Sequence, residues 1–406
     1  MMMMGMKRMG WEFERCIRAL RSASSLATSS NAVFDSSVKA AHRERAAFVA
    51  RARRKKNELT MDPFQKEVAT RLVERLAEVK RRFSRVLLIG GASHAVLGQL
   101  GDVLSPSDLE HVVVLDTERA MLDLCRDASR RLSLARPLVT RHIDDMESRH
   151  HESFVAQGED RFQLVVACLG LHWHNDLVSV LRKCQRSLEP DGFFLGSLLG
   201  EETMHEMRVS CMIAEAERES GFEAQRISPM ALVRDAGALL SSAGFALPSV
   251  DVDSITMRYR TPFDAVRHVR AMAESAAPVG GTRRVRFESA LAAQAIYQHT
   301  FGNDGSDGVP ATYQVINLAG WSPHMSQAAP ARRGSATASL ADIEQFLPPP
   351  VFTEIHEQDD STLPTDSDDS TATDTISAPH DERQQSTNHT LHPNSDSDDD
   401  DFHPQR

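Results

Sequence analysis

The sequence has little that would mark a disulfide framework, a zinc site or a membrane-spanning helix. Its 406 residues include five cysteines at irregular spacing, with no C-x-x-C pair among them. An odd, scattered set of this kind predicts reduced thiols in a protein core. No apolar run approaches the roughly 18 residues that a spanning helix needs, so we expect no transmembrane segment.

The C-terminal end is poor in apolar and basic residues. Residues 351–406 contain 15 Asp and Glu but only two Arg, and their aromatic residues are Phe352 and Phe402. Such a segment buries too little apolar surface to offset the entropy lost on ordering. We therefore expect residues 344–406 to be an acidic, disordered tail, either simply solvated or binding a basic partner. The net charge of the whole chain, −11, is a property of this tail.

The N-terminal end is poor in acidic residues. Residues 1–56 contain 13 Lys and Arg but four Asp and Glu, and Ser is abundant between positions 22 and 30. Trp11, Phe13 and Ile17 are spaced among the arginines as on an amphipathic helix. This composition predicts an organelle transit peptide over residues 1–30, followed by a basic extension over residues 31–62. The alternative is a basic disordered end.

Apolar periodicity in the middle of the chain alternates between strand and helix. Strands that alternate with helices predict a doubly wound, mostly parallel sheet covered on both faces. Thr117 and Asp176 stand where helix N-caps are expected. A tight Pro-Asp-Gly turn should precede the fifth strand. The expected strands are 85–90, 111–116, 137–143, 161–170 and 193–200, and the expected helices are 62–83, 117–134 and 176–188.

After Gly200 the rhythm changes to longer helices and two further strands. One helix should begin with Ser228 as its cap and Pro229 in its first turn, and it should stop at Gly244. We interpret residues 63–343 as one α/β domain with helical insertions over about 200–310. The expected helices are 201–221, 228–244, 261–275 and 283–301, and the expected strands are 248–259 and 311–321.

Polar residues follow the expected strands, at the edge of a parallel sheet where ligands bind. Asp116 ends the second apolar run and could accept hydrogen bonds from both ribose hydroxyls of a nucleoside, or cap the next helix. Asp144 and Asp145 could contact an adenine amine or cap a helix. The full set of candidate cofactor-binding residues is Gly90, Gly91, Ala92, Asp116, Thr117, Asp144, Asp145, Cys168 and Leu169.

His172 and Trp173 follow the fourth strand. His172 is a candidate general base if its pKa lies near neutrality, or a packed histidine that bonds to the backbone. Trp173 could wall a substrate pocket or simply pack. His174 and Asp176 form an H-x-D pattern, which is part of the ligand set of a non-haem iron site. Such a site also needs a second, distant histidine. We therefore expect no metal.

An ordered set of motifs resembles the mitochondrial complex I assembly factor 5 family. These are class I S-adenosylmethionine-dependent methyltransferase-like proteins. The motifs are "NAVFDSSVKAAHRERAA", "CLGLHWHNDL", "LEPDGFFLGSLLGEETMHEMR", "RISPMALVRDAGALLSSAGF", "ATYQVINLAGW" and "RRGSATASL". The resemblance implies a seven-stranded methyltransferase-like sheet and a location on the matrix side of the mitochondrial inner membrane. It also implies a role in assembling complex I with other assembly factors, and hydroxylation of an arginine on one of its iron–sulphur subunits.

The chain departs from the family in the loop after the first strand. The family loop resembles "LDLGCGRG", whereas this chain has Leu88 for the acid, Ala92 for the second glycine and His94 for the last. Ala92 would be strained if the turn needs a positive φ at that position. We therefore predict that S-adenosylmethionine binds in a weakened or altered way while the fold stays intact.

Charged residues after the fifth strand could hold a substrate guanidinium, because carboxylates match its geometry; an ordinary charged helix start is the alternative. The candidate substrate-binding residues are Trp173, Glu201, Glu202, Glu206 and Arg208, with Tyr259, Glu274 and Tyr313 as weaker candidates from the insertions.

Three functions stay open: an arginine-modifying enzyme that hydroxylates or methylates, a carboxyl methyltransferase of the biotin-pathway type, and a catalytically silent assembly chaperone. We expect no nucleic-acid partner.

Overall fold

The structure is a computed structural model that describes most of the chain between Ala32 and Ser326. Its helices and strands belong to one compact unit, which comprises Met1–Ser326 and Asn388–Arg406. The predicted transit peptide, Cys16 and nearly all of the predicted acidic tail lie outside the described residues. The described ranges are 32–55, 61–105, 108–130, 137–148, 151–156, 159–218, 227–280, 285–302, 308–328, 334–335 and 390–391.

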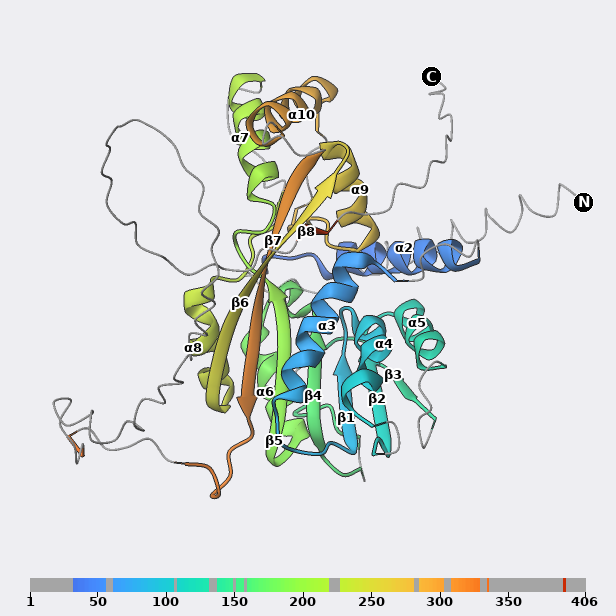
Figure 1. Ribbon diagram of the computed structural model, residues 1–406, viewed down its shortest axis with the longest axis vertical. Coiled ribbons are helices and arrows are strands. Elements are labelled where there is room, and N and C mark those ends of the chain that lie inside the picture. The colour runs from blue at the N-terminus through green and yellow to red at the C-terminus, as the bar shows by residue number, and fades with distance from the viewer. Residues whose placement is uncertain are drawn as a thin grey trace, which may run out of the picture. The chain divides into compact units, whose positions relative to one another are not determined.

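A seven-stranded sheet forms the centre of this unit (Figure 1). Its order is β3-β2-β1-β4-β5-β7-β6, and a two-residue strand, β8, pairs with β6 at the edge. Only β7 runs antiparallel to its neighbours, so the sheet is mostly parallel and of the class I methyltransferase type, as predicted. The strands are β1 (Arg85–Ile89), β2 (His111–Asp116), β3 (Val139–His142), β4 (Phe162–Cys168), β5 (Leu188–Leu199), β6 (Ala246–Tyr259), β7 (Val309–Trp321) and β8 (Thr390–Leu391).

Helices cover both faces of the sheet because its central strands are apolar on both sides. Val86 and Leu88 of β1 pack in the core beneath α3, α4 and α5. Leu87 and Ile89 point the other way, into the core beneath α6 and α8. The helices of these two layers are α3 (Pro63–Ala77), α4 (Ser93–Val103), α5 (Arg119–Ser129), α6 (Leu177–Ser187) and α8 (Val233–Ala243).

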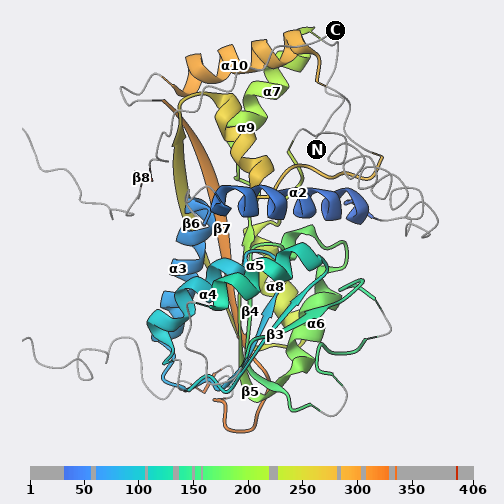
Figure 2. The same ribbon diagram turned by 90° about the vertical axis from the view of Figure 1, so that its right-hand side faces the viewer.

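The remaining helices lie beyond the carboxyl ends of the parallel strands (Figure 2). They are α2 (Ser36–Lys55), η2 (Leu171–Trp173), α7 (His205–Arg218), α9 (Pro262–Ala271) and α10 (Phe287–Phe301). Helix α2 starts after Asp35, whose carboxylate accepts hydrogen bonds from the amides of Ser37 and Val38. Helix α2 crosses the carboxyl ends of the parallel strands, so part of the expected N-terminal extension covers this edge of the sheet (Figure 2).

Three local predictions are wrong in detail. The N-cap position of α5 is Glu118, not Thr117. Helix α8 begins at Val233, not after Ser228, because Ala231 instead bridges to Gly200 beside the sheet. The Pro-Asp-Gly sequence lies inside β5 as an irregularity in its pairing with β4, and Asp191 there has a φ of 61°.

Other local predictions are confirmed. The Asp176 side chain accepts a hydrogen bond from the Ser179 amide and caps α6. Gly244 ends α8 in the left-handed conformation, with a φ of 93°. The four cysteines in the described ranges are free thiols, and three of them are buried. Separately from these predictions, the described part of the chain contains no helix that is both long and apolar enough to cross a bilayer.

Candidate functional site

A buried layer of charged side chains lies between α2 and the carboxyl ends of the strands. Lys39 and Arg43 are one turn apart on α2, so they share the face that meets the sheet. Arg43 reaches Asp116 at the end of β2, and Lys39 reaches Glu274 just after α9. Two cations from one helix therefore meet two acids that are distant in the sequence.

The Arg43–Asp116 ion pair is almost sealed from solvent. Arg43 Nη2 lies 2.5 Å from Asp116 Oδ2, and the Asp116 side chain is 1% exposed. The other carboxylate oxygen accepts the Glu118 amide at 2.8 Å. Burial lowers the pKa of Arg43, but the charge and hydrogen bond of Asp116 outweigh it and raise the pKa above its usual value. Arg43 Nε is buried without a hydrogen-bond partner, so the guanidinium is only partly satisfied.

Glu274 is the centre of the second half of the layer. Its Oε2 accepts a hydrogen bond from Trp173 Nε1 at 2.7 Å and lies 3.0 Å from His172 Nε2. Lys39 Nζ lies 3.8 Å from the same oxygen and 3.1 Å from the centre of the Trp173 ring. Burial raises the pKa of Glu274, but the charge of Lys39 and the hydrogen bonds lower it to about 2 overall. The carboxylate thus stays ionised although it is buried.

The geometry of His172 favours the packed reading over the general base. Its side chain has no exposed surface. Nε2 faces Glu274, and Nδ1 accepts the amides of Gly170 and Leu199 at 3.4 and 3.3 Å. Burial lowers the pKa of the ring, so it is neutral near pH 7, with its Nε2 proton directed at Glu274. Both nitrogens are engaged, and the histidine positions Glu274.

The glycine pair makes a tight turn between β1 and α4. Gly90 and Gly91 have φ angles of 51° and 52°, which favour glycine. A Cβ atom on Gly91 would lie 1.3 Å from the Leu169 carbonyl oxygen, so no other residue fits there. Ala92 has a φ of −95°, and the strain considered for it does not arise. Gly90 stands where the family loop has its first glycine, Gly91 stands where that loop has cysteine, and both have the positive φ that this turn requires.

His94 lies on the first turn of α4, near the charged layer. Burial lowers its pKa to about 4, and the charges of Asp62, Arg43 and Asp116 act on it in both directions. It is therefore a half-buried, neutral imidazole within electrostatic range of Arg43 and Asp116.

The described arrangement does not fit a nucleoside cofactor. In a sheet of this order, ligands enter the crevice where β1 and β4 diverge. Here the backbone of Gly91 touches the backbone of Leu169 and Gly170, and the Ala92 amide donates to the Cys168 carbonyl at 2.7 Å. Asp116, the acid that ribose hydroxyls need, is covered by Arg43. S-adenosylmethionine could reach Asp116 only if Arg43 moved away.

The other candidate cofactor residues are spread along the same edge. Cys168 is buried at the end of β4, and burial raises its pKa to about 12. Leu169 has a φ of 50°, and its amide donates to Ser197. Asp144 is fully exposed beside His142, and exposed Asp145 accepts the Glu147 amide. The aspartate pair thus lies outside the buried layer.

The structure does not bring the acids after β5 together as a guanidinium clamp. Glu206 is 2% exposed, and its carboxylate accepts the amide and hydroxyl of Thr312 on β7. Glu201 and Glu202 are exposed. Arg208 donates to the Glu201 carbonyl oxygen at 3.0 Å. This segment therefore ties α7 to the sheet.

Tyr259 and Tyr313 meet in a buried hydrogen-bonded chain. Their hydroxyls are 3.1 Å apart, and the Tyr259 hydroxyl lies 2.6 Å from His268 Nδ1. His268 Nε2 is in turn 2.6 Å from Asp62, the residue that caps α3. The chain fastens the start of α3 to α9, β6 and β7.

The H-x-D pattern does not form a ligand set. His174 faces Glu147, and Asp176 caps α6. Within the described ranges, no group of three or more His, Cys, Asp or Glu side chains could hold a metal ion.

Sequence reasoning missed Lys39 and Arg43. The available signal was their spacing in "VKAAHRERAA", where cations and alanines share one helical face. Glu274 was only a weak candidate because it follows a helix without any recognisable motif.

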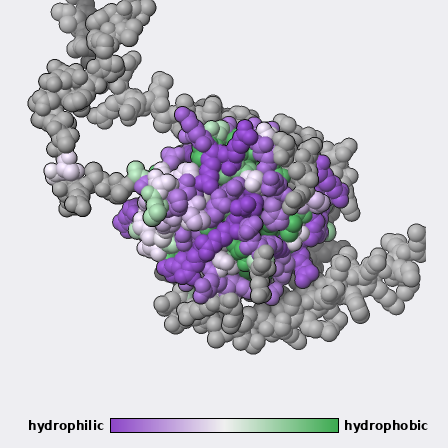
Figure 3. All heavy atoms as spheres, turned by 90° about the horizontal axis from the view of Figure 1, so that it is seen from below, coloured by the Kyte–Doolittle hydropathy of each residue, from purple (hydrophilic) through white to green (hydrophobic). Residues whose placement is uncertain are grey.

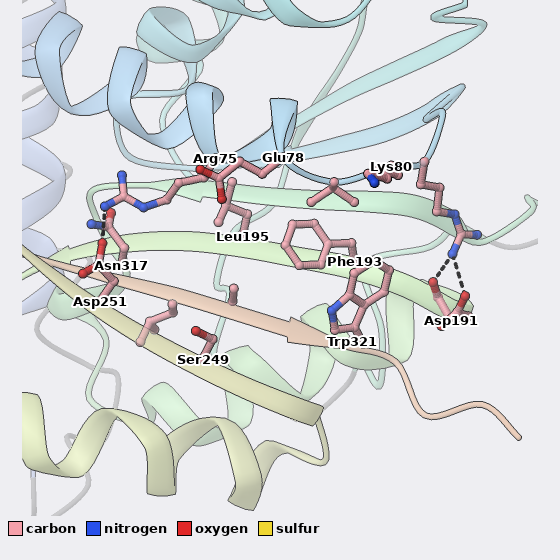
Figure 4. Close-up of a pocket in the computed structure, with 14 residues that line it drawn as sticks. Arg75, Glu78, Lys80, Asp191, Phe193, Leu195, Ser249, Asp251, Asn317 and Trp321 are labelled. Carbon is pink, nitrogen blue, oxygen red and sulfur yellow. Dashed lines mark hydrogen bonds and ion pairs between the residues drawn. The ribbon is translucent and has the colours of Figure 1, made fainter. Parts of the chain in front are cut away.

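A separate cavity of about 760 Å³ lies away from this layer, against β5, β6 and β7 (Figure 4). Phe193 and Trp321 line it, with ring centres 4.6 Å apart. Arg75, paired with Asp251, and Arg81, paired with Asp191, also line it.

Figure 3 views the unit from below, towards the amino ends of the parallel strands, and the residues coloured there are mainly hydrophilic.

Comparisons with known proteins identify similar chains. A family model described as a methyltransferase domain matches residues 87–196. A Danio rerio protein named Arginine-hydroxylase NDUFAF5, mitochondrial, is 37% identical over 287 residues, which cover 70% of this chain and 83% of that protein. A malonyl-[acyl-carrier protein] O-methyltransferase of Halorhodospira halophila is 33% identical over 260 residues, with coverages of 63% and 80%.

Solved methyltransferase structures are more distant. A putative methyltransferase of Bacillus halodurans has a TM-score of 0.41 at 15% identity and covers 62% of this chain and 97% of its own. The N-methyltransferase NodS of Bradyrhizobium japonicum, solved with S-adenosyl-L-homocysteine, has a TM-score of 0.33 at 12% identity, with coverages of 65% and 89%.

Proposed function

The chain belongs to the NDUFAF5 arginine-hydroxylase family, and on that premise we propose that it hydroxylates an arginine of another protein during complex I assembly in mitochondria. The target in this proposal is an iron–sulphur subunit of the complex, handled together with other assembly factors on the matrix side of the inner membrane. The name of the Danio rerio relative, a mitochondrial arginine-hydroxylase, supports the reaction and the organelle.

The observation that carries the proposal is the ionised carboxylate layer beneath α2. A guanidinium is recognised by charged carboxylates, with which it forms paired, charge-assisted hydrogen bonds. Asp116 already holds a guanidinium, and Glu274 stays ionised because Lys39, His172 and Trp173 surround it. This end of the sheet is therefore chemically suited to an arginine side chain.

The residues of the layer would bind and orient the substrate. Glu274 fixes Trp173 and Lys39 in place, and η2 and α2 are thereby held against the strand ends. Hydroxylation replaces a C–H bond with C–OH. In this proposal the added oxygen atom comes from dioxygen, and the second oxygen atom leaves as water with two protons and two electrons from an external reductant. We derive no step through S-adenosylmethionine, because the described arrangement does not fit it.

Mass spectrometry of the complex I iron–sulphur subunits tests the proposal. In cells that carry the protein, one arginine-containing peptide should be heavier by one oxygen atom than in cells that lack it. Glu274→Gln should abolish the added mass, because Lys39 loses its counter-charge. Glu74→Gln, an equal change at an exposed position of α3, should preserve it. An arginine of unchanged mass in every sample contradicts the hydroxylase proposal.

Two alternatives keep specific support. Similarity to malonyl-carrier methyltransferases favours a carboxyl methyltransferase, and the subunit spectra would then show no added oxygen, while a carrier-bound carboxylate would gain a methyl group. The closed crevice favours a silent assembly chaperone, and Glu274→Gln would then still restore complex I in cells that lack the protein.

A further inference from the structure

We propose that the substrate arginine binds to Asp116 at the position that Arg43 of α2 occupies in this structure (the seat). The substrate guanidinium displaces Arg43 from this position. The inference rests on the proposed function and adds to it the residue that recognises the substrate. It also gives α2 a role, since the helix must yield for the exchange to occur.

Charge conservation favours a guanidinium over a nucleoside in this seat. The Asp116 side chain is 1% exposed, and its counter-ion is Arg43. A ribose that displaced Arg43 would bring only neutral hydroxyls and leave a buried carboxylate without a matching charge, which is strongly unfavourable. An incoming arginine replaces one guanidinium with another, so the buried charge stays compensated throughout.

The backbone around the seat also opposes a nucleoside. Within the crevice between β1 and β4, the backbone of Gly91 packs so closely on Leu169 and Gly170 that a Cβ atom on Gly91 would lie 1.3 Å from the Leu169 carbonyl oxygen. A guanidinium that follows the path of Arg43 approaches from the α2 side and does not need this crevice. The planar group is also narrower than an adenosine.

Arg43 holds the seat incompletely. Its Nε is a buried donor without an acceptor, which weakens the occupied state relative to a fully satisfied guanidinium. Glu118 lies close enough for its charge to act on Arg43, and burial raises its pKa to about 7. A substrate arginine placed slightly differently can use this second carboxyl group, and then it binds through both acids.

Helix α2 is fastened to the rest of the unit on both sides of Arg43. Asn175 accepts the amides of Val33 and Phe34 at 2.8 and 2.9 Å and donates to the Phe34 carbonyl. Beyond Arg43, the buried residues Ala46 and Ala47 pack on Met121 and Leu124 of α5. Arg51 also pairs with Asp123 of α5 and donates to the Ala120 carbonyl oxygen. Helix α2 is therefore anchored on both sides of Arg43, so the exchange requires it to yield only locally, around Arg43.

Peptide titration of the full-length protein tests the exchange. The probe is a fluorescent glycine-rich peptide with one central arginine, and the control peptide carries lysine instead. Arg43→Gln removes the internal competitor, so its affinity for the arginine peptide should rise about tenfold or more over the wild type. Arg45→Gln, the same change at an exposed position of α2, should bind as the wild type does. Adding Asp116→Asn to Arg43→Gln should remove the gain.

Hydrogen exchange in the wild-type protein tests the same exchange without any variant. The arginine peptide should speed exchange of the α2 amides around Arg43, and the lysine peptide should not.

Three results would overturn the inference. The first is tighter binding of S-adenosylmethionine to Arg43→Gln without a gain for the peptide, which would make Asp116 a nucleoside ligand. The second is a folded Arg43→Gln with unchanged affinity for both ligands. The third is unchanged α2 exchange in the wild type at saturating arginine peptide. None of these measurements needs turnover, so the inference can fail while subunit mass spectra still show hydroxylation, and the reverse also holds.

Discussion

Removing one partner of the Arg43–Asp116 pair should destabilise the protein strongly. Asp116→Ala leaves the guanidinium buried and uncompensated, and such losses cost about 3 to 5 kcal/mol. It also deletes the acceptor of the Glu118 amide, worth about 1 kcal/mol. The expected loss is therefore about 4 to 6 kcal/mol of unfolding free energy, a large share of the roughly 5 to 15 kcal/mol of a typical domain.

A double-mutant cycle measured by urea unfolding separates the pair from its surroundings. Asp116→Asn keeps an acceptor for the Glu118 amide and should lose about 3 kcal/mol, as should Arg43→Met. The double variant buries no charge at this position, so its loss should fall short of the summed single losses by about 2 kcal/mol or more. Single losses below about 1 kcal/mol that simply add would refute a buried, coupled pair.

This prediction changes how a rescue experiment should be designed. Asp116→Ala in cells confuses lost chemistry with lost stability, since an unstable protein also fails to restore complex I. On these magnitudes the double variant Arg43→Met with Asp116→Asn loses no more than about 4 kcal/mol, less than Asp116→Ala, and it also removes the acid. A silent chaperone should work with it, whereas an arginine-binding enzyme should not.

Three further outcomes follow from the site. In calorimetric titration, S-adenosylmethionine should bind the wild type more weakly than a low-micromolar dissociation constant, which corresponds to a binding free energy of about −8 kcal/mol. A micromolar dissociation constant would contradict the proposed exclusion of the cofactor. Although burial raises the pKa of Glu274, Lys39 lowers it to about 2 overall, so its stabilising effect is complete above the unfolded value of about 4.3. Stability measured by denaturant should therefore fall as pH drops from about 4.5 towards 2, and Glu274→Gln should flatten that part of the profile. Gly91→Ala should lower stability by more than about 3 kcal/mol, because its methyl group meets the Leu169 carbonyl, whereas Ala92→Gly should cost about 1 kcal/mol; equal melting temperatures for the two variants would contradict the turn geometry.

Local chemistry made much of the fold predictable. Apolar runs bounded by helical periodicity located the strands and helices of the sheet, since burial on both faces requires them. Residues whose role depends only on neighbours within one helical turn were also predictable from the sequence. Asp176, which caps the start of α6, and Gly244, which ends α8, are examples. The glycine pair belongs to the same class, because the β1–α4 turn itself demands positive φ.

What the sequence determined by itself was the class of sheet, its alternating order and the edge at which acids gather. Only the tertiary structure decided which cation meets which acid. Arg43 is 73 residues from Asp116, and Lys39 is more than 200 residues from Glu274. Sequence periodicity shows which face of a helix a residue occupies. Which residues that face contacts depends on where the helix packs in the tertiary structure. Tertiary placement also explains why Glu206 bonds to Thr312 and why Arg43 covers Asp116, the acid that the sequence analysis had assigned to a ribose.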